Sequence, residues 1–235
     1  EEDSDLDTAL IDTYSRAGIT SDPLTHNSRP PVMEDLYDTL LHMGGTGPRL
    51  AQRLRKYTTG TFAGIFSQQS NIDINNQMVV FNIRDLEDEL RPVAMYITLS
   101  HIWNITRTDQ RRRMLIVDEA WQLMKYEDSA NFLFSLAKRA RKYYLGITTI
   151  TQDVEDFMGS RMGRAIVANS SMQLLLKQSV SAVEVLSDVF KLTEAEKSGF
   201  PVGQGLFFAG QNHVHIEIAS SDTEYGLITT NPMER

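Results

Sequence analysis

Residues 114–121, Met-Leu-Ile-Val-Asp-Glu-Ala-Trp, constrain the fold of this chain more than any other segment. Four apolar residues lead directly into two acidic ones, Asp118 and Glu119. A continuous apolar run of this kind is typical of a strand that is buried on both faces of a parallel sheet. Parallel α/β sheets bind their ligands at the carboxyl ends of the strands. The segment therefore predicts an α/β fold with two carboxylates at a ligand-binding edge.

These two carboxylates have two explanations. If the strand continues through both residues, Asp118 and Glu119 point to opposite sides. That division suits a nucleotide triphosphatase, in which one acid holds magnesium and the other orients or deprotonates the attacking water. Alternatively, both acids precede a helix that begins at Trp121, where negative charge is stabilised by the helix dipole. The segment alone leaves both explanations open.

Composition limits the class of protein. The chain has 235 residues, of which 41% are hydrophobic, so it can build an α/β core with an appendage. Its net charge of −8 argues against an extended nucleic-acid coat, although local basic clusters remain. Without cysteine, disulfides and thiolate metal sites are excluded. No apolar run is long enough to span a bilayer, so we expect the chain to be soluble as given and any membrane association to come through partners.

Residues 1–75 predict an all-α subdomain. Apolar spacing indicates a short helix near 5–16 and two helices within 32–57. The glycines of Gly44–Gly47 lie between these two helices and lack the Lys-Ser/Thr that ends a phosphate-binding loop, so we interpret them as a turn. The chain begins abruptly with Glu-Glu-Asp and no methionine, which suggests a piece of a longer protein.

Residues 76–235 alternate predicted strands and helices, as expected of an α/β core. Strands are predicted at 78–83, 114–119, 145–151 and 172–176, helices at 92–106, 129–144, 161–168, 181–190 and 193–199, and a final hairpin at 205–210 and 213–219 with its turn at Gln211–Asn212. The strand–helix–strand–helix–strand order up to residue 151 predicts parallel crossovers and a doubly wound sheet.

Two further groups could complete a site around the acids. Gln152 ends the strand that we expect beside 114–119, where its amide could contact a γ-phosphate oxygen and the attacking water. A basic cluster at the end of the helix 129–144 contains Arg139 and Arg141. Either arginine could neutralise phosphate charge, in its own subunit or in a neighbouring one. Basic residues at this position also simply favour the negative end of the helix dipole.

The ordered set Leu-Ile-Val-Asp-Glu-Ala-Trp, Ala-Arg-Lys and Thr-Gln resembles the carboxy-terminal ATPase domain of the CagE/TrbE/VirB family. These proteins are the large ATPases of type IV secretion and conjugation. The resemblance covers 78–232 well and 1–77 loosely. It implies a RecA-like P-loop NTPase fold related to the hexameric HerA/FtsK motors, with a mostly parallel sheet flanked by helices. Residues 1–75 would then be a helical insertion and 76–235 the ATPase core.

The resemblance also implies roles for single residues, with ATP and Mg²⁺ as the ligands. Asp118 and Glu119 match the Walker B acids, so Asp118 would hold the metal and Glu119 would activate water. Gln152 and Arg141 match the family's arginine-to-Thr-Gln motif, with Arg139 as the second candidate for a catalytic arginine. The implied partners are other secretion-system components at the inner membrane, further copies of the chain in a hexamer, and a DNA or protein substrate.

One motif of the family is missing. No Gly-x-x-x-x-Gly-Lys-Ser/Thr occurs in the chain, so the β- and γ-phosphates lack their main cradle. The chain is a fragment, a degenerate relative, or one part of a site completed by another polypeptide, and the retained acids favour a fragment.

Three functions follow from these readings. The first is a secretion or conjugation ATPase that powers assembly or substrate transfer. The second is a HerA/FtsK-like motor that contacts DNA through Arg111–Arg113, and the third is a docking module with a relic nucleotide site.

Overall fold

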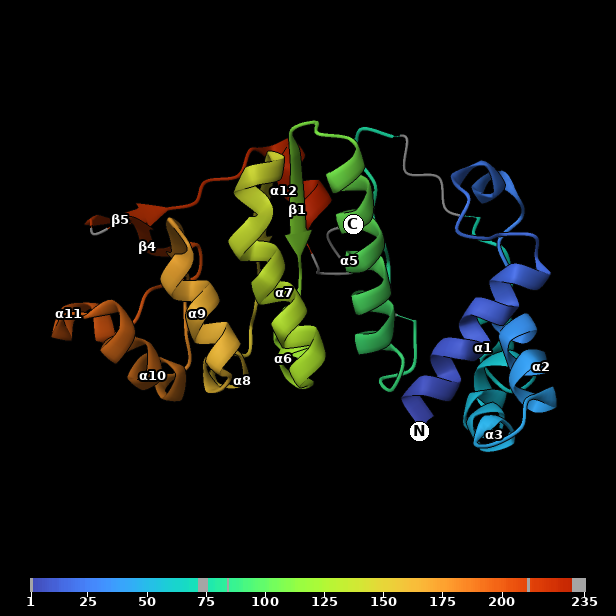
Figure 1. Ribbon diagram of the computed structural model, residues 1–235. Coiled ribbons are helices and arrows are strands. Elements are labelled where there is room, and N and C mark those ends of the chain that lie inside the picture. Colours follow the sequence, from blue (N-terminus) through green and yellow to red (C-terminus); the bar gives the residue numbers. More distant parts are fainter. Residues whose placement is uncertain (1, 72–75, 84, 211, 230–235) are drawn as a thin grey trace. The chain divides into compact units, whose positions relative to one another are not determined.

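The computed structural model describes residues 2–71, 76–83, 85–210 and 212–229, which form two compact units, Glu1–Val79 and Val80–Arg235 (Figure 1). None of the helices in these ranges combines the length and the apolar character that a membrane span requires.

The first unit consists of helices joined by turns and loops, with no strand among its described residues. Its elements are α1 (Glu2–Arg16), the 3₁₀ helix η1 (Pro23–Asn27), α2 (Met33–His42), α3 (Gly47–Thr58) and α4 (Ala63–Phe66). A small apolar core joins the first three α-helices, formed by Ala9, Leu36, Leu40, Leu50 and Ala51. Gly44–Gly47 connects α2 to α3, with Gly45 at a φ of +66°. The predicted helix–helix turn is therefore confirmed.

An acidic side chain links α1 to the start of α3. Asp5 on α1 accepts hydrogen bonds from the Thr46 hydroxyl (2.6 Å) and the Thr46 backbone N–H (3.0 Å) at the start of α3. These two hydrogen bonds favour the charged carboxylate and lower the pKa of Asp5 below its ordinary value. The contact links residues that are 41 positions apart in the sequence.

The second unit contains a parallel pair of strands with helices packed on one face. Its first half consists of α5 (Arg91–Thr108), β1 (Arg113–Val117), α6 (Trp121–Met124), α7 (Glu127–Ala140), η2 (Arg141–Tyr143) and β2 (Leu145–Thr149). β1 and β2 pair in parallel, with Arg113 opposite Leu145 and Val117 opposite Thr149. This arrangement confirms the predicted strand–helix–strand crossover between them.

The second half of this unit adds helices and a separate antiparallel sheet. Its elements are α8 (Val154–Gly159), α9 (Arg161–Asn169), β3 (Met172–Leu175), α10 (Val180–Phe190), α11 (Glu194–Lys197), β4 (Gln204–Ala209), β5 (Asn212–Glu217) and α12 (Asp222–Ile228). β3 pairs with β4, and β4 with β5, both antiparallel. The predicted final hairpin is confirmed, although Gln211 in its turn lies outside the described residues.

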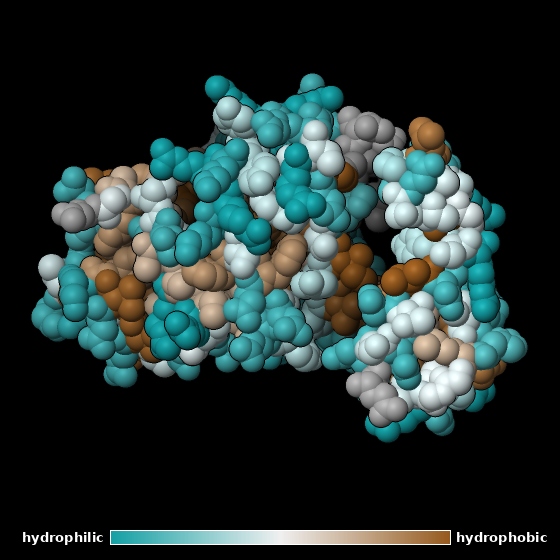
Figure 2. All heavy atoms as spheres, in the orientation of Figure 1, coloured by the Kyte–Doolittle hydropathy of each residue, from teal (hydrophilic) through white to brown (hydrophobic). Residues whose placement is uncertain are grey.

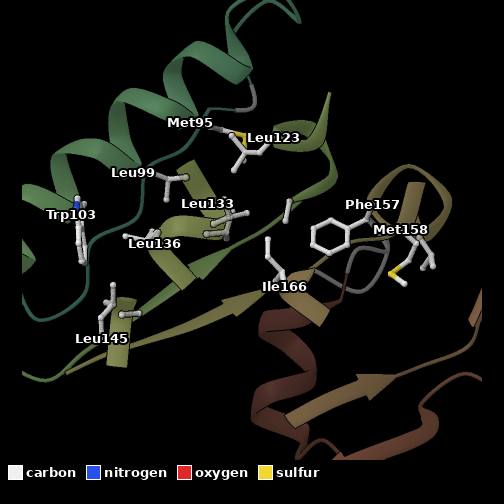
Figure 3. Close-up of a cluster of buried hydrophobic side chains, with 14 of the residues drawn as sticks. Met95, Leu99, Trp103, Leu123, Leu133, Leu136, Leu145, Phe157, Met158 and Ile166 are labelled. Carbon is white, nitrogen blue, oxygen red and sulfur yellow. The ribbon is translucent and has the colours of Figure 1, made fainter. Parts of the chain in front are cut away.

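One continuous core holds the second unit together. Helix α5 contributes Met95, Leu99 and Trp103, which face side chains from α6, α7 and β2 (Figure 3). Phe157, Met158 and Ile166 extend the same cluster to α8 and α9. The core therefore fixes α7 against the strand pair. Polar side chains cover much of the surface, but Figure 2 shows apolar surface over α5, whose exposed face includes Val93 and Ile97.

Two predictions about strands are wrong. Residues 78–83 form no strand in the described part of the chain, and Met78 and Val80 are exposed. The strand at 114–117 is not buried on both faces: Val117 is buried, whereas Met114 and Ile116 are 68% and 62% exposed. The helices of the second unit cover only one face of the pair.

Candidate functional site

The carboxyl end of β1 is a turn rather than a continuation of the strand. β1 ends at Val117, and Asp118, Glu119 and Ala120 lead into α6. The neighbouring strand segment still fixes this turn, because Ala120 donates a backbone hydrogen bond to the Ile150 carbonyl (2.9 Å). The prediction that both acids extend the strand is therefore wrong, and their side chains are directed by the turn.

Glu119 has an unusual backbone conformation. Its φ is +49°, in the left-handed region that residues with a Cβ rarely adopt. Such conformations cost free energy and persist only where surrounding contacts enforce them. Here Ala120 and Leu123 on the following turn are fully buried, so the chain on the carboxyl side of Glu119 is anchored in the core.

Both oxygens of the Glu119 carboxylate accept a hydrogen bond. The side-chain amide of Gln152 donates to Oε1 at 3.0 Å. The indole N–H of Trp121 donates to Oε2 at 2.5 Å. Gln152 follows β2, so the parallel pairing of β1 and β2 brings these residues together at one edge, although they are 33 positions apart. The expected proximity of Glu119 and Gln152 is thus observed.

Asp118 has a different environment from Glu119. Its side chain is exposed, and Oδ1 accepts a hydrogen bond from the Glu119 backbone N–H at 2.9 Å. Oδ2 has no hydrogen-bond partner among the residues that the structure describes. The same residues contain no cluster of three or more acidic or histidine side chains that could enclose a metal. One free carboxylate oxygen still fits Mg²⁺, which proteins commonly hold through one or two carboxylates, with water and substrate phosphates completing the shell.

The candidate arginines lie away from this cluster. Arg139 and Arg141 are exposed at the end of α7 and the start of η2, which precede β2. Since Arg113 pairs with Leu145, they are at the amino end of the strand pair, and five residues of strand separate that edge from Glu119, about 15 Å. Arg139 donates to the Ser135 carbonyl and its guanidinium lies 5.6 Å from the Trp103 ring centroid. The structure does not bring either arginine to the acids of the same chain.

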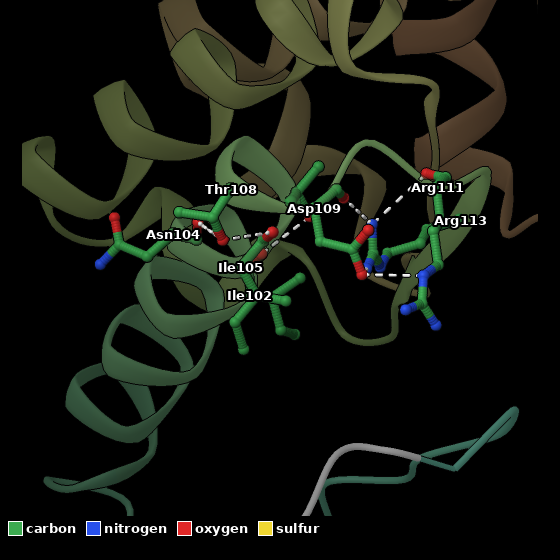
Figure 4. Close-up of polar contacts among 8 residues, drawn as sticks. Ile102, Asn104, Ile105, Thr108, Asp109, Arg111 and Arg113 are labelled. Carbon is green, nitrogen blue, oxygen red and sulfur yellow. Dashed lines mark hydrogen bonds and ion pairs between the residues drawn. The ribbon is translucent and has the colours of Figure 1, made fainter.

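The basic cluster before β1 is partly neutralised. Arg111 and Arg113 both form ion pairs of 2.9 Å with Asp109, which follows α5 (Figure 4). Both ion pairs lie between the end of α5 and the first residue of β1. They leave less free positive charge for a nucleic acid than the sequence suggests.

Sequence reasoning did not identify Trp121 as a site residue. The sequence does show that Trp121 lies two residues after Glu119, and a partly buried indole N–H usually finds a hydrogen-bond acceptor. The sequence does not show that this acceptor is Glu119, because the contact depends on the left-handed turn.

Comparisons with known proteins agree on one family. The profile described as TraG P-loop domain matches residues 50–200. Protein TraC of Escherichia coli K12 is 31% identical over 137 residues, which are 54% of this chain and 16% of TraC. The type IV secretion system protein VirB4 of Bartonella quintana is 24% identical over 152 residues, 63% of this chain and 19% of that protein.

The fold is also that of a solved relative. The structure of VirB4 of Thermoanaerobacter pseudethanolicus superimposes with a TM-score of 0.84 and 30% identity, covering 94% of this chain and 64% of that one. The predicted RecA-like P-loop fold class is thereby confirmed. The present chain spans less than a fifth of the curated relatives it matches.

Proposed function

Because the chain belongs to the TraG P-loop domain family, we propose that it carries the water-activating part of the ATP site in a type IV secretion or conjugation ATPase. The match to VirB4 and TraC confirms the family that the motifs predicted. The single observation that carries the proposal is the Glu119–Gln152 hydrogen bond of 3.0 Å at the carboxyl edge of the parallel pair. This edge is where α/β folds bind ligands.

In the proposed reaction, Glu119 acts as the base for an attacking water. The water oxygen forms a bond to the γ-phosphorus, the bond from the γ-phosphorus to the ADP oxygen breaks, and the proton of the water passes to the Glu119 carboxylate. Gln152, whose amide already contacts Glu119, orients the same water. Asp118 would hold Mg²⁺ through its free oxygen, and the cation would neutralise phosphate charge.

Two contributions to the proposed site come from outside this cluster. No phosphate-binding loop occurs in these 235 residues, and we assign it to another part of the full-length protein. The short span of the chain relative to TraC and VirB4 supports this assignment. A role for Arg139 or Arg141 requires a neighbouring subunit, since both lie at the opposite edge of β1 and β2. Supplied in that way, an arginine contributes roughly 10³–10⁵ in rate.

The proposed setting follows the relatives. VirB4 is by name a type IV secretion system protein, and we extend that setting to this chain, with secretion-system components as partners on the cytoplasmic side of the inner membrane. Residues 1–75 as a helical insertion and 76–235 as the ATPase core belong to the same proposal. The pairing of Arg111 and Arg113 with Asp109 gives no support to the DNA-translocating alternative.

The test is the substitution Glu119→Gln in the full-length protein. The amide keeps the size of the side chain but cannot accept the proton, so we expect ATP hydrolysis to fall by about 10²–10⁴-fold while ATP still binds. Glu127→Gln is the matched control, because Glu127 is an exposed acid in the first turn of α7. Hydrolysis by Glu119→Gln at the rate of this control would refute the role of Glu119.

A further inference from the structure

We infer that Trp121 is a positioning residue for Glu119, holding the carboxylate through its indole N–H in the orientation needed to activate water. The inference rests on the proposed ATPase function and adds a residue to its site. The contact that carries it is the hydrogen bond of 2.5 Å from Trp121 Nε1 to Glu119 Oε2.

A carboxylate on a turn needs restraint to act as a base. Glu119 has two side-chain torsions beyond Cβ, and a Gln152 contact on Oε1 alone would leave the carboxylate free to rotate about that contact. The second hydrogen bond, on Oε2, fixes the plane of the carboxylate. Gln152 is exposed, so it can exchange its contact with Glu119 for a contact with water or phosphate. The Trp121 contact would persist during turnover, because the Trp121 ring packs against the core.

Trp121 is itself well anchored. It begins α6, whose Leu123 is completely buried, and its ring packs against the main core of the unit. The ammonium of Lys125, the residue that follows α6, lies 4.4 Å from the ring centroid, a cation–π contact. The indole N–H of Trp121 is therefore a fixed donor, and the Glu119 carboxylate that accepts its hydrogen bond extends from a backbone held at a φ of +49°. Well-supported geometry of this kind is what a general base requires, since errors near 1 Å can cost about 10²-fold in rate.

The alternative is a purely structural tryptophan whose N–H has simply found an acceptor. The two roles differ in what they change. A structural role affects folding and leaves turnover of the folded protein intact. A positioning role lowers kcat for ATP and leaves KM unchanged, because Trp121 touches the base and not the nucleotide.

The first experiment measures hydrolysis by Trp121→Phe in the full-length protein. Phenylalanine keeps an aromatic ring for the core and for Lys125 but lacks the N–H donor. We expect kcat to fall about 10- to 100-fold with KM for ATP unchanged. Trp103→Phe is the matched control, because Trp103 is the only other tryptophan of these 235 residues and lies in the same core, 6% exposed. Turnover by Trp121→Phe equal to that of Trp103→Phe would overturn the inference.

A replacement of the same shape distinguishes loss of the N–H donor from loss of folding. Benzothienylalanine at position 121 replaces the indole N–H by sulfur and keeps the bicyclic shape, so we expect the same fall in kcat in a protein that melts at the parental temperature. Unchanged kcat with this residue would also overturn the inference.

An emission measurement separates this inference from the proposed function. In a Trp103→Phe background of the isolated 235-residue chain, Trp121 is the only tryptophan, and its pyrrole N–H faces the Glu119 charge. Glu119→Gln should shift its emission to shorter wavelength, because a negative charge beside that nitrogen stabilises the excited state. No shift would show that the contact is absent, whatever the hydrolysis rate. A parental full-length protein that hydrolyses no ATP would overturn the proposed function, and the positioning role with it, while the shift would still report the contact.

Discussion

Gly163 on α9 is a position at which one added methyl group should loosen the segment that follows Gln152. A Cβ at Gly163 would lie 1.9 Å from the Phe157 carbonyl oxygen and 2.9 Å from its carbonyl carbon. Ordinary van der Waals contact begins near 3.4 Å, so α8 and α9 would have to separate by more than 1 Å. The obstacle is backbone, which cannot rotate away as a flexible side chain could.

We expect Gly163→Ala to lower the free energy of unfolding by about 2 kcal/mol. Overpacking in a closely packed region typically costs 1–3 kcal/mol, and a clash with backbone belongs at the upper end. Alanine also has about 1 kcal/mol better helix propensity than glycine, which offsets part of this cost. Because Phe157 is buried and α8 begins two residues after Gln152, the shift should also disturb the Gln152–Glu119 contact.

Chemical denaturation of the 235-residue chain measures this effect. The matched control is Gly159→Ala, also in the α8–α9 segment, where an added Cβ meets nothing within 4 Å and φ is not positive. We expect the control to unfold at the parental denaturant concentration, within the equivalent of about 0.5 kcal/mol. If Gly163→Ala were as stable as Gly159→Ala, the close packing of α9 on α8 would be wrong.

Two other predictions concern stability. Leu133→Ala removes a fully buried side chain from the core between α5, α7 and the strands, and should cost about 2–5 kcal/mol in denaturant unfolding; a cost below about 1 kcal/mol would contradict that burial. Asp5→Asn should destabilise the helical unit at neutral pH, because Thr46 hydrogen bonds to Asp5 favour the carboxylate. Since the pKa of Asp5 is lowered on folding from an ordinary value of 3.8, this stabilisation is present above about pH 4 and is lost as the pH falls through the lower folded value. Thermal melting should therefore show a larger difference between variant and parent at pH 7 than at pH 2–3, and a difference of equal size at both would contradict the mechanism.

The family and its fold class were predictable because their signals are local. The apolar run before Asp118 predicted a strand, the spacing of apolar residues predicted α5 and α7, and a crossover between two such strands is parallel by a general rule of chain geometry. Parallel pairing then places the carboxyl ends side by side, which is why the proximity of Glu119 and Gln152 could be expected from two motifs far apart.

Other features depended on contacts between distant segments. Apolar periodicity at 78–83 and 172–176 predicted strands, but periodicity does not identify a partner. The first segment forms no strand among the described residues, and β3 joins β4 in an antiparallel sheet. The exposure of Met114 and Ile116 likewise depends on which elements cover each face. The sequence also did not show that β1 ends at Val117. The strand stops there because the chain turns into α6, where Ala120 and Leu123 are buried in the core.

Residue type and position after an apolar strand are enough to identify the chemical groups of the candidate site, Asp118, Glu119 and Gln152. Their geometry depends on contacts that the sequence does not show. The tertiary structure turned Glu119 into the left-handed region, joined its carboxylate to Trp121 as well as Gln152, and left Arg139 and Arg141 at the opposite edge. The physical reason is that residue type and spacing report what a segment can do, whereas burial and hydrogen bonding between distant segments select which conformation it adopts.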